Sequence, residues 1–223
     1  MLYQNVCLEA FAHTLPEEIV TSTEIEARLE PLYRRLRLPE GRLELMSGIR
    51  ERRFWAPGTL PSDKSVETAE KVIRLAGVDK DDVGALVHGS VCRDFLEPAT
   101  ACGVHHRLGL PKDCLICDVS NACLGILNGI VQVANMIELG QIRAGLVVGT
   151  ESARHLVENT IASLNSQTDL TRRQIKNAIA SLTIGSGSCA MLLVDRRLSR
   201  TGNRLVGAMV RAHSAHHRLC HSG

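Results

Sequence analysis

Short apolar runs alternate with helical patterns along most of the chain, and this alternation limits the possible folds more than any other feature of the sequence. Such chains fold as βαβ units, in which helices cover a largely parallel sheet. Two β-rich segments follow the last predicted helix, so we predict an α/β fold with a mixed sheet. The predicted helices span residues 65–76, 100–108, 122–139 and 172–180, and the predicted strands span 85–90, 114–119, 144–149, 188–194 and 205–212.

Composition limits both the core and the partners of the chain. Hydrophobic residues make up 44% of the 223 residues but aromatic residues only 3%, so the core must be built from Ala, Val, Leu and Ile. Such a core suits strands that are buried under helices on both faces. The 26 basic and 24 acidic side chains give a net charge of +2, without a basic stripe interleaved with aromatic residues. Nucleic acid is therefore not an expected partner.

The sequence gives no sign of secretion or of membrane insertion. No apolar run approaches the roughly 20 residues that cross a bilayer, and the first residues lack the basic and apolar regions of a signal peptide. We therefore expect a cytoplasmic protein that does not span a membrane. Several of its eight cysteines, among them Cys7, Cys117 and Cys189, lie in strand-like segments, so we expect reduced thiols.

Cys123 stands near the start of a predicted helix, after a tight turn that follows a buried strand. Unpaired backbone N–H groups and the helix dipole favour the thiolate over the thiol at such a position. The small neighbours Ala122 and Gly125 would let a substrate carbonyl approach, and the N–H of Cys123 could bind the oxyanion that forms on attack. These residues predict a nucleophile, and a buried structural cysteine is the alternative that they leave open.

Four motifs in chain order give the sequence a family resemblance. Residues 118–129 read Asp-Val-Ser-Asn-Ala-Cys-Leu-Gly-Ile-Leu-Asn-Gly and resemble the active-site segment of the β-ketoacyl synthase III family of thiolase-fold condensing enzymes. Residues 48–53, 148–151 and the glycine-rich 184–190 resemble further motifs of that family. The resemblance implies the thiolase fold, in which two similar layered α/β halves each contain a mixed, five-stranded type of sheet.

The resemblance also implies a domain organisation and a reaction. Residues 1–200 would form the N-terminal half, with a charged insertion near 17–60, and residues 201–223 would begin a truncated cap or second half. Enzymes of this family transfer an acyl group from coenzyme A or acyl carrier protein to the cysteine, and a second thioester then attacks it to give a 3-oxoacyl product. Cys123 would be that acyl acceptor, in a homodimer that needs no cofactor or metal. The family's catalytic histidine and asparagine lie in the second half, and no residue here is assigned to them.

Glu97 points to one branch of the family. It precedes Pro98 in the segment 90–100, where ordinary synthase III enzymes lack an acid, and it resembles a glutamate of the enzymes that join two fatty acyl-CoA molecules head to head in long-chain olefin biosynthesis. An unactivated acyl-CoA needs a base to remove its α-proton, whereas a malonyl group loses CO₂. Glu97 is the candidate base, contributed across the dimer, with Phe95 and Leu96 as apolar surroundings; a helix cap or a solvated acid is the alternative.

Coenzyme A recognition departs from the family pattern. Arg42 and Met46 stand where synthase III enzymes have a tryptophan and an arginine. Arg53 and Trp55 are therefore the candidate residues for binding the phosphate and adenine groups of coenzyme A, although a tryptophan is more often a packed residue.

Three rival motifs carry less weight. His216, His217, Cys220 and His221 match no standard zinc spacing, so no metal site is predicted. Cys114 and Cys117 lie along a strand rather than at a helix start, which disfavours a redox pair. The glycine-rich residues 185–190 precede a strand instead of opening a helix, which disfavours nucleotide binding.

The sequence therefore predicts an acyltransferase that condenses fatty acyl-CoA molecules through a cysteine acyl-enzyme. A malonyl-ACP-dependent β-ketoacyl synthase III is the nearest alternative. An inactive thiolase-fold fragment that dimerises or binds acyl chains is the alternative from another class.

Overall fold

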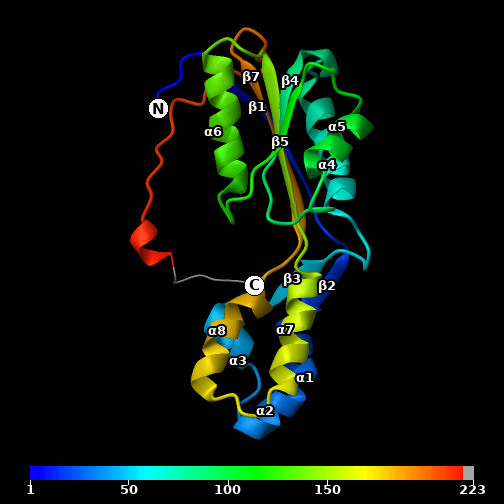
Figure 1. Cartoon of the computed structure of the whole chain (residues 1–223), viewed down its shortest axis with the longest axis vertical. Coiled ribbons are helices and arrows are strands. Elements are labelled where there is room, and N and C mark those ends of the chain that lie inside the picture. The colour runs from blue at the N-terminus through cyan, green and yellow to red at the C-terminus, as the bar shows by residue number, and fades with distance from the viewer. Residues whose placement is uncertain (218–223) are drawn as a thin grey trace.

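The computed structural model describes residues 1–217, which form a sheet domain and a smaller helical lobe (Figure 1). The sheet has five strands in the order β1-β7-β6-β4-β5. β4 pairs in parallel with β5 and β6, whereas β7 pairs antiparallel with β6 and β1, so the sheet is mixed as predicted. The strands are β1 (Val6–Thr14), β4 (Val83–His88), β5 (Leu115–Asp118), β6 (Ala144–Glu151) and β7 (Gly187–Asp195).

Helices cover both faces of this sheet, and the core between them is aliphatic. α4 (Pro61–Ala76) and α5 (Thr100–Leu108) pack on one face, while α6 (Gly125–Glu138) packs on the other (Figure 1). The core under α4 and α5 includes Leu86 and Leu146, and the core under α6 includes Val87 and Val147. Alternate residues of the parallel strands are therefore buried on opposite faces. Within residues 1–217, no helix combines the length and apolar character that a membrane span requires.

The helical lobe is assembled from two segments that are far apart in the sequence. Residues 18–54 supply β2 (Glu18–Thr21), α1 (Ser22–Arg28), α2 (Glu30–Leu36), α3 (Arg42–Ser47) and β3 (Glu51–Phe54), while residues 154–183 supply α7 (Arg154–Ser166) and α8 (Arg172–Thr183). Leu29 and Leu32 of the first segment share one apolar cluster with Val157 and Ile161 of the second. Most of the charged stretch near 17–60 therefore belongs to a packed lobe that needs both segments.

The strand predicted over residues 205–212 does not form. The segment makes one isolated bridge, Leu2 with Gly207, and Val206 and Met209 are 67% and 79% exposed. A strand at a sheet edge is stabilised by burying one of its faces. No element within residues 1–217 covers Val206 and Met209, so extended pairing has little to stabilise it there.

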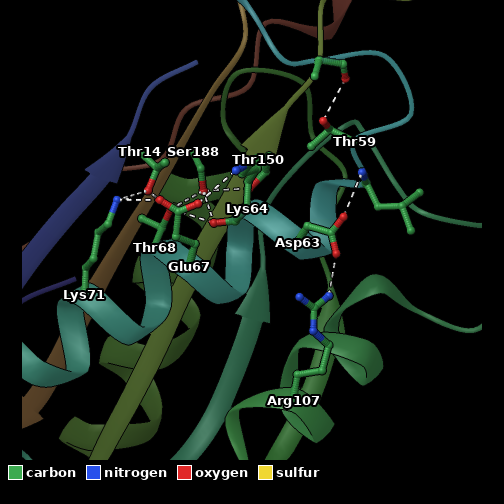
Figure 2. Close-up of polar contacts among 12 residues, drawn as sticks. Thr14, Thr59, Asp63, Lys64, Glu67, Thr68, Lys71, Arg107, Thr150 and Ser188 are labelled. Carbon is green, nitrogen blue, oxygen red and sulfur yellow. Dashed lines mark hydrogen bonds and ion pairs between the residues drawn. The ribbon is translucent and has the colours of Figure 1, made fainter. Parts of the chain in front are cut away.

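A cluster of buried hydroxyl groups fastens α4 to the sheet (Figure 2). Thr68 of α4 donates to Thr14 of β1 at 2.8 Å or to Ser188 of β7 at 2.9 Å, and Thr150 of β6 lies 2.7 Å from Ser188. Ser65 of α4 lies 2.8 Å from Thr150. All five residues are buried, so their hydroxyl groups need hydrogen-bond partners within the protein, which the cluster supplies together with Lys71 and the carbonyl of Lys64.

Replacing Thr68 by Val will lower the free energy of unfolding by about 1–3 kcal/mol, because it removes the buried hydrogen bonds of Thr68 with Thr14 and Ser188. Urea denaturation followed by circular dichroism measures the change. Thr160→Val is the matched control, since both hydroxyls bond the carbonyl four residues earlier but Thr160 contacts no other element through its hydroxyl. An equal loss in both variants would contradict a role for the cluster.

Candidate active site

Cys123 lies where the carboxyl ends of the parallel strands meet the start of α6. Ala122 has φ of 44°, in the left-handed region, and the N–H of Leu124 donates to the carbonyl of Asn121 at 2.9 Å. This tight turn leaves Cys123 exposed, one residue before Leu124, the N-cap of α6. The predicted strand-to-helix turn is therefore present, although the helix begins at Gly125 and Cys123 stands just in front of it.

Three glycines bring the backbones around this turn into direct contact. A Cβ added to Gly149 would lie 2.5 Å from the carbonyl oxygen of Gly89, and one added to Gly125 would lie 2.9 Å from the carbonyl carbon of Gly89. Gly89 follows β4, Gly149 lies in β6 and Gly125 opens α6. Only residues without a side chain allow this approach, which presses the start of α6 against the strand ends.

Cys123 opens into a pocket with a volume of about 370 Å³. Small and apolar residues dominate its wall, so a thioester carbonyl can reach the sulfur without displacing a large side chain. Glu151 and His13 are the titratable groups besides the cysteines in this wall. The lining residues are His13, Leu15, Gly89, Ala122, Cys123, Ile126, Gly149, Glu151, Gly187, Ser188 and Cys189.

Gly149→Ala will destabilise the fold by about 1–3 kcal/mol, because the new methyl group overpacks the glycine contact. The measurement is denaturant unfolding together with the rate at which iodoacetamide alkylates Cys123. Gly103→Ala in α5 is the control, since a Cβ there meets nothing within 4 Å. That variant will gain up to about 1 kcal/mol from helix propensity. A stable Gly149→Ala protein would contradict the importance of the contact.

The loop 89–99, here called the acid loop, carries Glu97 away from the pocket of its own chain. Glu97 is exposed, and its carboxylate makes no hydrogen bond or ion pair within residues 1–217. Phe95 and Leu96 are 61% and 90% exposed, so the expected apolar surroundings do not form inside one chain. Glu97 is not among the residues that line the Cys123 pocket, so the structure does not bring these two predicted residues together within one chain.

Glu151 is the site residue that sequence reasoning missed. Its Oε1 accepts hydrogen bonds from Ser90 Oγ and the N–H of Val91, both at 2.9 Å, and its Oε2 accepts one from the N–H of Cys92 at 3.2 Å. Glu151 ends β6 and also lines the Cys123 pocket. The sequence does contain a signal for Glu151, which is an acid at the end of a buried apolar strand. The ends of parallel strands lie at one edge of the sheet, where sites form.

Asp118 fixes the other end of the acid loop. Its carboxylate accepts hydrogen bonds from the N–H groups of Thr100 and Ala101 at 2.8 and 2.9 Å, in the first turn of α5. His88 is fully buried beside it, with Nδ1 at 3.9 Å from Asp118 Oδ1. Burial lowers the pKa of His88, although Asp118 opposes that shift. His88 is therefore neutral at pH 7, and Asp118 is left to bind the helix.

The two residues predicted to bind coenzyme A are engaged in the chain itself. Arg53 donates to the carbonyl of Pro16 at 2.8 Å. Trp55 is only 4% exposed, its Nε1 donates to the carbonyl of Glu151 at 3.1 Å, and Lys64 Nζ lies 5.3 Å from its ring centroid. These contacts leave little of the indole face for adenine, so the assignment of coenzyme A binding stays a prediction.

The rival motifs fall at separate places in the described chain. The seven cysteines within residues 1–217 form no disulfide, and Cys117 lies in β5 as expected. Gly187 begins β7, so the glycine-rich segment precedes a strand as predicted. Cys220 and His221 lie outside the described residues. Among residues 1–217, no three His, Cys, Asp or Glu side chains gather as metal ligands would.

Iodoacetamide at pH 8 will label Cys123 well before Cys92 or Cys114. Burial raises the pKa of both Cys92 and Cys114 to about 11, so few of these thiols are ionised at pH 8, whereas Cys123 is exposed. Peptide mapping by mass spectrometry measures each rate. Raising the pH toward 11 will accelerate labelling of Cys92 and Cys114, and faster labelling of either at pH 8 would contradict this arrangement.

Comparisons with known proteins agree with the fold. Residues 59–199 match the family model described as thiolase, N-terminal domain. An acyl-CoA:acyl-CoA alkyltransferase from Shewanella oneidensis is 45% identical over 226 residues, which cover 100% of this chain and 64% of the relative. A crystal structure of an OleA variant from Xanthomonas campestris superposes with a TM-score of 0.93 at 35% identity, covering 100% of this chain and 66% of that one.

A solved structure of a synthase III enzyme superposes equally well on this chain. The 3-oxoacyl-(acyl carrier protein) synthase III from Xanthomonas oryzae pv. oryzae superposes with a TM-score of 0.94 at 37% identity, again over 100% of this chain and 66% of that one. A mixed sheet with helices on both faces defines an α/β protein. The chain belongs to the thiolase family and forms the N-terminal half of its fold, spanning 64% of the Shewanella relative.

Proposed function

We propose that the protein containing this chain condenses two fatty acyl-CoA molecules by a Claisen reaction. The observation that carries the proposal is the exposed Cys123 in front of α6, inside a pocket that glycine contacts hold at the strand ends. The name of the 45% identical relative, acyl-CoA:acyl-CoA alkyltransferase, supports acyl-CoA as the substrate. The reacting thioesters are substrates, so the proposed reaction requires no resident cofactor or metal.

The first step forms the acyl-enzyme. The thiolate of Cys123 attacks the thioester carbonyl, the carbon–sulfur bond to coenzyme A breaks, and the coenzyme A thiolate leaves. The N–H of Cys123 stabilises the oxyanion of the tetrahedral intermediate. The pocket walls keep the acyl group beside the sulfur for the second step.

Glu97 acts in the second step as the base that removes an α-proton from another acyl-CoA. The resulting carbanion attacks the acyl-enzyme, and the Cys123 sulfur leaves to give the 3-oxoacyl product. The free carboxylate of Glu97, on an exposed loop outside its own pocket, supports action in the pocket of a second copy.

A homodimer would bring these two residues together. β5 is the edge strand of the sheet, its first residue Leu115 is 47% exposed, and the acid loop beside it exposes Phe95 and Leu96. Edge strands and apolar patches of this kind pair with another chain. The partner would cover Phe95 and Leu96 and give Glu97 the apolar surroundings that one chain lacks. We place this dimeric enzyme in cytoplasmic fatty acid metabolism.

A malonyl-ACP-dependent β-ketoacyl synthase III is the second candidate, favoured by the TM-score of 0.94 to the Xanthomonas oryzae synthase. Such an enzyme would use Cys123 in the same way but would obtain its carbanion by decarboxylation, so Glu97 would be dispensable. An inactive subunit that only dimerises or binds acyl chains would use neither residue.

Full-length protein supplied with fatty acyl-CoA alone will release coenzyme A and form a 3-oxoacyl product, measured by mass spectrometry. Cys123→Ser will abolish the acyl adduct, whereas Glu97→Gln will keep the adduct and slow condensation by about 100-fold or more. Glu40→Gln, at another exposed loop acid, is the control and will change neither step. Strict dependence on malonyl-ACP would favour the synthase III reaction, and failure to acylate Cys123 would favour an inactive subunit.

A further inference from the structure

Hydrogen bonds tie the start of the acid loop to the end of β6. The N–H groups of Val91 and Cys92 donate to the carboxylate of Glu151, and Ser90 Oγ donates either to that carboxylate at 2.9 Å or to the carbonyl of Thr150 at 2.7 Å. The N–H of Ser152 donates to Cys92 Sγ at 3.2 Å, and that sulfur lies 3.6 Å from the carbonyl oxygen of Ser152. This set of contacts between residues 90–92 and 150–152 is here called the loop clasp.

Glu151 and Glu97 differ in what their carboxylates do. Both oxygens of Glu151 accept hydrogen bonds from the loop, so its lone pairs are already occupied. Glu97 makes no such contact within residues 1–217. A carboxylate that binds backbone N–H groups builds structure, while an unengaged carboxylate on the same loop remains able to accept a proton.

The far end of the acid loop is fixed as well. Asp94 Oδ1 accepts a hydrogen bond from the N–H of Ser62 at 2.9 Å, and Asp118 binds the first turn of α5 directly after the loop. The exposed residues 95–98 thus project between two anchored ends. Loss of the loop clasp would release one of these ends and let Glu97 sample many positions.

We propose that Glu151 is a positioning residue that holds the acid loop so that Glu97 meets the acylated Cys123 of a second copy. This inference rests on the proposed function, because it gives Glu97 the role of base. Glu151 touches no reacting atom in this scheme. Glu151 also contacts both parts of the proposed site within one chain. Its side chain lines the Cys123 pocket and accepts hydrogen bonds from the loop that carries Glu97.

Glu151→Gln in the full-length protein tests the inference, because the amide NH₂ places a donor where the carboxylate accepted. Hydrogen exchange at the amides of residues 90–99, followed by mass spectrometry, will accelerate by about tenfold or more, as expected for losing a hydrogen bond to a charged group. Acylation of Cys123 by acyl-CoA will continue near the wild-type rate, while condensation will slow by about 100-fold. The double variant with Glu97→Gln will be no slower than Glu97→Gln alone.

Glu138→Gln is the matched control, because Glu138 also binds two backbone N–H groups, those of Gln4 and Asn5, but at the C-terminal end of α6. It will leave both loop exchange and condensation unchanged. Unchanged loop exchange in Glu151→Gln, or losses in the two single variants that multiply in the double variant, would overturn the positioning role. If Glu97→Gln itself condenses at the wild-type rate, the proposed base is wrong, and Glu151 then has no catalytic group to position.

Discussion

The direct contact of backbone with backbone at Gly89, Gly125 and Gly149 is the constraint on which the rest of the site depends. Parallel strands β4 and β6 end at the same edge of the sheet, and the contact sets the start of α6 against both ends. The turn that holds Cys123 has no other place to lie once this contact forms. The place of Cys123 therefore follows from packing, because the exposed thiol and the N-terminus of α6 are positioned by the same three residues.

Two sets of hydrogen bonds hold the elements around the site. Buried hydroxyl groups hold α4 against the sheet, and one of them, Ser188, also lines the Cys123 pocket. Carboxylates then fix the acid loop at both ends, and only the tip with Glu97 is left free. In the proposed reaction, covalent chemistry would take place at Cys123 beside the tightly packed glycines, and proton transfer would take place at the exposed tip of the acid loop, next to a second copy.

The sequence predicted the central elements well because each carries a strong local signal. The helix over residues 100–108 matches α5 residue for residue, and the strands around Cys123 were recognised from their apolar runs. The short helices α1 to α3 were missed, since their charged sequence hides apolar positions such as Leu29 and Leu32, which become a core only against α7 and α8. The false strand over residues 205–212 shows the reverse case, a β-rich pattern in which Val206 and Met209 stay exposed within residues 1–217.

The site residues also differ in how far the sequence could predict their positions. The place of Cys123 before α6 could be predicted because a strand, a turn and a helix follow one another in the sequence. The loop contacts of Glu151 could not, because they depend on the register that brings the end of β6 beside residues 90–92, and that register is a tertiary property. The exposure of Phe95 and Leu96 likewise reflects the three-dimensional path of the loop, whereas their apolar character alone suggested burial.

The helical lobe has a consequence for how the protein is made. Its two segments meet through contacts such as Arg35 with the carbonyl of Leu164 and Arg172 with that of Leu36, which join residues 129 and 136 positions apart. During translation, α1 to α3 therefore leave the ribosome before α7 and α8 have been synthesised. During that interval the apolar faces of the early helices have no partner, so this segment is the part of the nascent chain on which a chaperone would act.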